Sequence, residues 1–181
     1  MRRISSWLIA IFAVVLVVLG GIALAAQDKY TVQVPGGLAF SEFRGYEDWP
    51  VVAVSHPDGK LNVIVANTAM IEAYLAGIPN NGQPFPDGSK MAKIAWKPKQ
   101  SEEAPFAVSI PDTLMAVGFM VKDSQRFADT GGWGWADFDY DPASDMFTPN
   151  TSLQGSDAKC GFACHTIVEA KDYVFTAYGK R

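Results

Sequence analysis

The chain has 181 residues, of which 49% are hydrophobic and 12% aromatic, a composition too apolar for a disordered tail and sufficient for one packed domain. Its 15 Lys+Arg and 19 Asp+Glu leave a formal net charge of -4. Nucleic-acid binding requires a clustered positive field, so this balance excludes nucleic acid as an expected partner.

The first 26 residues predict export. Arg2 and Arg3 precede an uncharged run from Trp7 to Ala26, and Ala23-Leu24-Ala25 has the small-x-small pattern of a cleavage site. The run is also close to the roughly 20 residues that span a bilayer, so an uncleaved membrane anchor is the alternative to a signal peptide. In both cases residues 27–181, expected to form a single domain, lie on the outer side of the membrane.

In chain order, residues 27–45 are weakly patterned and are expected to pack as an arm. The next part of the domain is predicted to form strands at 51–55 and 61–66, a helix capped by Asn67 or Thr68 and ended by Gly77, a loop to about Gly88, and a strand at 91–96. The last part is predicted to form strands at 106–110 and 113–121 separated by Pro111, a short helix at 123–127, a strand at 133–140, a polar connection at 141–155, a helix from 156 or 157 through 170, and a strand at 173–178.

Short turns between consecutive strands are typical of antiparallel pairing. The predicted fold class is therefore α+β, a mainly antiparallel β-sheet with a few short helices packed on it. The aromatic residues of the predicted strand at 133–140 fit either the wall of a flat cofactor or ordinary sheet packing, namely Trp133, Trp135, Phe138 and Tyr140.

One dense chemical motif stands near the C-terminus. Cys160-Gly161-Phe162-Ala163-Cys164-His165 holds both cysteines and one of the 2 histidines. Two cysteines followed directly by histidine are typical of covalent haem, in which the thiols add to the porphyrin vinyls and the histidine ligates iron. Three residues separate the cysteines instead of the usual two, although positions i and i+4 of a helix still share a face. The motif predicts haem c on Cys160 and Cys164, with His165 as the iron ligand. A Cys160–Cys164 disulfide in a haem-free exported binding domain is the alternative.

The chain from Tyr46 to Tyr178 resembles the cytochrome P-460 family. The resemblance rests on segments in a fixed order: Tyr46-Glu47-Asp48-Trp49, Phe85-Pro86-Asp87-Gly88, residues 121–127, the haem motif, and Asp172-Tyr173-Val174-Phe175-Thr176. It implies a strand-rich haem c domain with the haem site near the C-terminus. It also implies oxidation of hydroxylamine, to nitrous oxide, nitric oxide or nitrite, at a five-coordinate iron.

In that family a lysine is bonded covalently to a meso carbon of the haem. The resemblance selects Lys93, which follows the Phe-x-Asp-Gly turn, as a cofactor-binding and catalytic residue. The residues alone fit a solvent-facing lysine equally well, and Lys90 is a nearby competitor on the opposite strand face.

A proton acceptor is also needed near bound hydroxylamine. Asp137 and Asp139 share one strand face and are the candidates, although both also fit ordinary exposed strand residues. A sixth protein ligand to iron is not expected, because His56 lies in a turn and the methionines at 91, 115 and 120 are typical of core packing.

The resemblance further implies hydroxylamine or nitric oxide as the small ligand, a periplasmic cytochrome as electron acceptor, and dimerisation. We expect a periplasmic protein, free or anchored to the inner membrane. The alternative function is that of the β-sheet cytochrome c-prime relatives, which share the fold, lack the lysine link and bind nitric oxide or carbon monoxide.

Overall fold

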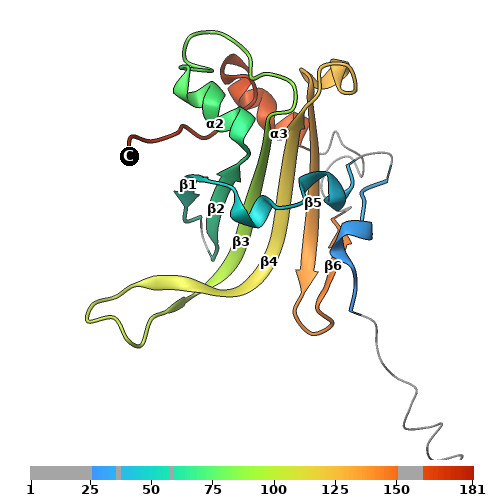
Figure 1. The fold of residues 1–181 in the computed structure, drawn as a ribbon. Helices are drawn as coiled ribbons and strands as arrows, with labels where there is room; N and C mark the ends of the chain where they lie inside the picture. The colour runs from blue at the N-terminus through green and yellow to red at the C-terminus, as the bar shows by residue number, and fades with distance from the viewer. Residues whose placement is uncertain (1–25, 36–37, 58, 151–160) are drawn as a thin grey trace, which may run out of the picture.

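The computed structural model describes residues 26–35, 38–57, 59–150 and 161–181 (Figure 1). Six strands form one antiparallel sheet in the order β1-β2-β3-β4-β5-β6. Their bounds are β1 (Val51–Ser55), β2 (Leu61–Ala66), β3 (Lys90–Gln100), β4 (Ser109–Lys122), β5 (Trp133–Asp141) and β6 (Met146–Pro149). Each strand pairs with its neighbour in sequence, and the predicted fold class is confirmed.

The helices are short and lie around this sheet. Within the described residues two are α-helical, α2 (Thr68–Leu75) and α3 (Phe162–His165). The others are 3-10 turns: η1 (Lys29–Thr31), η2 (Phe40–Phe43), η3 (Tyr46–Asp48), η4 (Ala128–Thr130) and η5 (Thr166–Lys171). The predicted cap of α2 is confirmed, because Met70 N donates to Asn67 Oδ1 at 3.2 Å. Figure 1 shows α2 and α3 together at one end of the sheet, whereas β3 and β4 extend beyond the other strands at the opposite end.

The sheet has an apolar cluster on each face. On one face the N-terminal segment packs as the predicted arm, with Phe43 stacked on Phe119 at 4.1 Å between ring centroids and Phe40 5.0 Å from Phe138. The other face carries Met91, Met120, Trp133 and Trp135 against α2 and the C-terminal segment, with Met70, Phe85 and Val174 among the contacts. The chemical motif lies on this second face.

Strand alternation explains the two clusters and corrects one interpretation. Trp133 and Trp135 point to the face of the motif, but Phe138 belongs to the cluster of the arm on the opposite face, and Tyr140 packs against that same cluster. These four aromatic residues therefore do not form one wall. Odd and even positions of a regular strand cannot share a face.

In the second half of the domain, the predicted break between two strands and the predicted lack of a strand at 141–155 were wrong. Residues 106–110 and 113–121 are not separate strands, because β4 runs through Pro111, which pairs with Pro98 beside a register shift. Proline is tolerated there because an irregularity in the ladder relieves the missing donor. The polar connection predicted at 141–155 contains β6, where Phe147 pairs with Tyr140.

The elements near residue 125 and at the C-terminal end also differ from prediction. Residues 123–127 form a turn, in which Asp123 Oδ1 accepts from Arg126 N at 2.9 Å, rather than a helix. The helix predicted through residue 170 is described from Phe162 onward and continues as η5. Residues 173–178 form no strand, because the chain turns away at Asp172 and Tyr173, which both have positive φ.

The export segment falls outside the described residues except for Ala26. Among the residues that are described, no helix is long and apolar enough to cross a membrane.

Candidate haem site

The sheet register brings two candidate residues into one row. Lys93 on β3 pairs with Gly118 on β4, which in turn pairs with Asp137 on β5. The preceding row on the same face is Met91, Met120 and Trp135. Lys93 and Asp137 therefore flank Gly118 next to the apolar cluster that lies below the chemical motif.

Gly118 leaves space that both neighbouring side chains use. A Cβ atom at Gly118 would lie 2.6 Å from Asp137 Oδ1 and 3.4 Å from Lys93 Cε. The carboxylate and the lysine chain thus lean over the glycine from opposite sides. A glycine within a strand marks close approach of another group, which here is the pair of polar side chains.

Asp137 and Asp139 differ in environment although they share a face. Asp137 is half-buried, and burial raises the pKa of its carboxyl; the nearby Lys93 ammonium partly opposes this rise and Asp139 adds to it. Asp139 is exposed and accepts from Asn150 Nδ2 at 3.2 Å. Asp137 is therefore the better placed proton acceptor of the two.

The chemical motif contacts the sheet at Gly161. A Cβ atom at Gly161 would lie 2.3 Å from Trp135 Cγ, so the backbone of the motif rests directly on the indole ring. Cys164, in α3, is exposed. Cys160 lies outside the described residues. The predicted pair of attachment sites is thus described at one of its two positions.

His165 is oriented by a backbone carbonyl. Its Nδ1 lies 2.6 Å from Tyr173 O, and because a carbonyl can only accept, Nδ1 carries the proton and Nε2 keeps its lone pair. The ring also packs 5.2 Å from the Trp135 ring and 4.9 Å from that of Phe175, between centroids. Burial lowers the pKa of His165, the Tyr173 carbonyl opposes this and Lys93 adds to it. The imidazole is therefore held neutral, as a metal ligand must be.

These residues fit a covalently held haem. His165 offers a neutral Nε2, Cys164 offers an exposed sulfur, and two polar side chains, Lys93 and Asp137, flank Gly118 in one row of the sheet. Within the described part of the chain the buried Trp135 Nε1 has no hydrogen-bond partner, so a carboxylate of a bound group would satisfy it. The donor set and this orphaned donor are together consistent with haem c.

The remaining candidates lie elsewhere. Lys90 is on the opposite face, where its Nζ donates to Glu42 O at 2.6 Å, so it does not compete with Lys93. His56 is exposed in its turn, and Met91 and Met120 are buried in the apolar cluster. Met115, on β4, is half-buried. None of these positions suggests a second iron ligand.

Sequence reasoning missed Gly118 and the Tyr173 carbonyl. A lone glycine inside an otherwise apolar strand is a usable signal for close approach, and it could have drawn attention to Gly118. The hydrogen bond from His165 to Tyr173 O had no such signal, because any residue carries a carbonyl.

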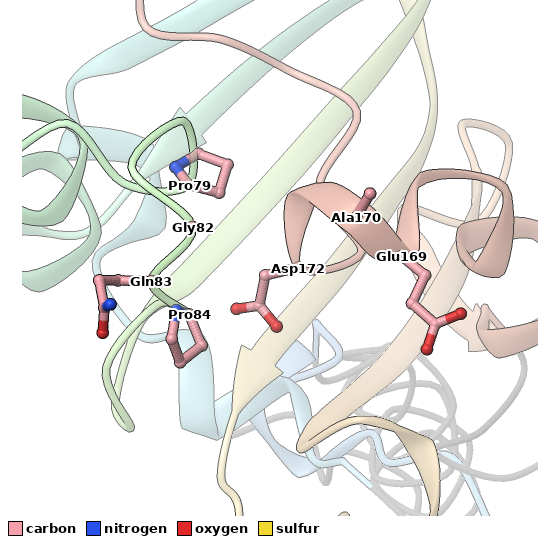
Figure 2. A pocket seen from close by; sticks show the side chains of 7 residues that line it. All are labelled: Pro79, Gly82, Gln83, Pro84, Glu169, Ala170 and Asp172. Atoms are coloured by element: carbon pink, nitrogen blue, oxygen red, sulfur yellow. The ribbon is translucent and has the colours of Figure 1, made fainter.

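A cavity of about 180 Å³ opens beside this site (Figure 2). The loop at 79–84 faces η5 across it, and the lining side chains include Glu169 and Asp172. Both acids are already engaged, since Glu169 Oε1 accepts from Tyr173 Oη and Asp172 Oδ2 accepts from Phe85 N. The residues that line the cavity include none of Lys93, Asp137 and His165.

The model of the family described as Cytochrome P460 matches residues 43–176, which is most of the chain and includes every candidate site residue from Lys93 to His165. No curated protein matches the chain. The chain therefore belongs to the cytochrome P460 family, and it is a haem c protein that binds its haem covalently. The predicted family and cofactor are confirmed, and the haem-free alternative is set aside.

Proposed function

We propose that this protein oxidises hydroxylamine at its haem c, which is held by thioether bonds to Cys160 and Cys164, by His165 as axial ligand and by a bond to Lys93. The observation that carries the proposal is the row in which Lys93 and Asp137 flank Gly118, on the sheet face where His165 packs against Trp135. The bound haem would supply a redox-active iron that withdraws electrons from the substrate.

The protein supplies the proton acceptor. Oxidation of hydroxylamine to nitrous oxide, nitric oxide or nitrite releases at least one proton for each electron removed, so a base is needed throughout. Asp137 lies beside Gly118 in the row that also holds Lys93, and its raised pKa makes the carboxylate a stronger base than an ordinary one. Before Lys93 is bonded to the haem, its ammonium favours the carboxylate form of Asp137.

The protein also fixes the axial ligand and limits access of water. The Tyr173 carbonyl fixes the tautomer and orientation of His165, and burial between Trp135 and Phe175 lowers its pKa and so favours the neutral ring. The apolar row of Met91, Met120 and Trp135 borders the polar row on one side. With His165 as its one ligand from the protein, the iron of a bound haem would keep a position for a small nitrogen substrate.

Reversible binding of nitric oxide or carbon monoxide is the second candidate. It requires the same His165 and haem but no bond to Lys93. The residue pattern around Lys93 favours it, because that pattern fits a solvent-facing, unmodified lysine as well as a bonded one. The state of Lys93 therefore separates the two functions.

The setting of the reaction forms part of the same proposal. Residues 27–181 would act as one haem domain in the periplasm, either freed from or anchored by residues 1–26. Electrons would pass to a periplasmic cytochrome, and two copies of the chain would form a dimer. The basic start and uncharged run of the N-terminal segment support export.

The test is anaerobic turnover of hydroxylamine by the purified haem-loaded protein, measured as reduction of an artificial electron acceptor and as nitrous oxide. Lys93→Leu should abolish turnover and shift the haem absorption. Lys97→Leu removes another exposed lysine of the same strand and should leave both unchanged. Reversible carbon monoxide binding without any hydroxylamine turnover in the unchanged protein would favour the gas-binding function instead.

A further inference from the structure

The carbonyl that orients His165 lies in an unusual stretch of backbone. Asp172 has a φ of 49° and Tyr173 a φ of 64°. The left-handed region is unfavourable for residues with side chains, and more so for a bulky residue such as tyrosine. Two such residues in succession persist only where surrounding contacts hold them, so these contacts determine where the Tyr173 carbonyl lies.

The Asp172 carboxylate is held from two sides. Its Oδ1 accepts from Lys122 Nζ at 2.7 Å and its Oδ2 accepts from Phe85 N at 2.8 Å. The side chains of Lys122 and Asp172 are only 7% and 12% exposed. Water and salt screen such a pair much less than a surface ion pair, so it constrains the backbone at Asp172 firmly.

Lys122 anchors the neighbouring residue as well. Its Nζ donates to Gly131 O at 2.9 Å, and the ring of Tyr173 rests on Gly131, where a Cβ atom would lie 2.2 Å from Tyr173 Cε2. Lys122 therefore fixes both the carboxylate of Asp172 and the surface that supports the Tyr173 ring. Both restraints hold the residues that lead into the Tyr173 carbonyl, which accepts from His165.

We propose that the buried Lys122–Asp172 ion pair is the positioning unit of the axial ligand: it holds the Tyr173 carbonyl against His165 Nδ1 and thereby sets the orientation and donor strength of the imidazole. The inference rests on the proposed role of His165 as the iron ligand and does not depend on the substrate. An acceptor on the second ring nitrogen makes a histidine ligand more basic and fixes its ring.

This role also connects three segments of the sequence. Phe85, Lys122 and Asp172 each belong to one of the separate motifs that carry the family resemblance, and they meet at a single carboxylate. The motif at 85–88 also contacts the motif at 121–127 directly, because Ser124 N donates to Asp87 Oδ1 at 2.8 Å. The three motifs thus form one support below the haem ligand.

The experiment uses the haem-loaded protein with Lys122→Met or Asp172→Asn. Asparagine tolerates the left-handed region and keeps an oxygen for Phe85 N, so this change removes little besides the charge. The readouts are the iron–imidazole stretching band of the ferrous protein by resonance Raman spectroscopy and the haem midpoint potential. Both variants should lower the band frequency and raise the potential, because each loosens the same carbonyl and weakens donation from His165.

The signs of the midpoint-potential shifts in the two variants distinguish a change in the position of the Tyr173 carbonyl from the loss of a charge near the haem. Loss of a nearby cation alone lowers the midpoint potential, and loss of a nearby anion alone raises it. Shifts of opposite sign in the two variants, or no shift of the band, would therefore overturn the inference. Lys99→Met is the control, since it removes a lysine from the exposed ion pair with Asp112 and should change neither readout.

A double variant and a His165 variant test the inference where a single variant fails to fold or where the iron ligand is in question. If one single variant fails to fold, the double variant Lys122→Met, Asp172→Asn leaves no unpaired buried charge and should fold with the lowered band frequency. A double variant with the original band would count against positioning. If His165→Gly keeps the band, the axial assignment fails and the inference with it. A protein with the predicted shifts but no hydroxylamine turnover would retain the inference and lose only the proposed substrate.

Discussion

Replacing Gly118 by alanine tests the placement of Asp137 in the row of Lys93, Gly118 and Asp137. The added Cβ atom would lie 2.6 Å from Asp137 Oδ1, whereas carbon–oxygen contacts of this kind are about 3.3–3.6 Å. The carboxylate must therefore move by about 0.7–1 Å. The contact with Lys93 Cε, at 3.4 Å, is ordinary and requires little change. Gly118→Ala thus displaces the proposed base and leaves the lysine nearly in place.

A misplacement of about 1 Å costs on the order of 100-fold in rate. We expect turnover of hydroxylamine by Gly118→Ala to fall by about that factor, with haem content and midpoint of thermal unfolding close to those of the original protein. The assay is steady-state reduction of an artificial acceptor, with haem quantified by its pyridine haemochrome. Gly179→Ala is the matched control, because no atom lies within 4 Å of the position of its added Cβ. Undiminished turnover in Gly118→Ala would refute the role of Asp137.

Three other predictions concern the same face of the sheet. Asp137→Asn should slow turnover by about 10²–10⁴-fold and abolish the loss of rate on acidification, because the amide does not take up a proton in this pH range. Asp139→Asn should keep the original pH–rate profile, and equal effects of both changes would contradict the assignment. Asp137→Asn should also raise the free energy of unfolding at pH 7, measured by urea titration. Burial raises the pKa of Asp137. The stability that the protonated carboxyl contributes is therefore present below the ordinary carboxyl pKa and is lost as the pH rises through the raised pKa. An unchanged unfolding midpoint would argue against burial of the charge. Gly161→Ala should reduce covalent haem content, since its Cβ would lie 2.3 Å from Trp135 Cγ; normal haem content would show that the motif does not rest on that ring.

The first two strands were predictable because local signals agree there. The turn at Pro57 and Gly59 bounds two runs rich in β-branched residues, and β1 and β2 begin and end where these runs do. Strand alternation also placed Lys93 apart from Lys90 and put Asp137 on the same face as Asp139. These are consequences of period-two geometry and need no tertiary information.

The errors arise where long-range contacts override local pattern. Residues 173–178 alternate like a strand, but the left-handed conformation of Asp172 and Tyr173 depends on a lysine fifty residues earlier in the chain. The different burial of Asp137 and Asp139 depends on which part of β5 lies near the motif, and the sequence of β5 does not contain that information.

The covalent state of Lys93 is the most direct test of the account. The measurement is mass spectrometry of proteolytic peptides from the purified haem-containing protein, combined with the absorption spectrum of its reduced form. We predict one haem that joins the peptide containing Cys160 and Cys164 to the peptide containing Lys93, with an absorption spectrum unlike that of ordinary haem c. An ordinary haem c spectrum together with an unmodified Lys93 peptide would contradict the proposed enzyme and leave a gas-binding protein.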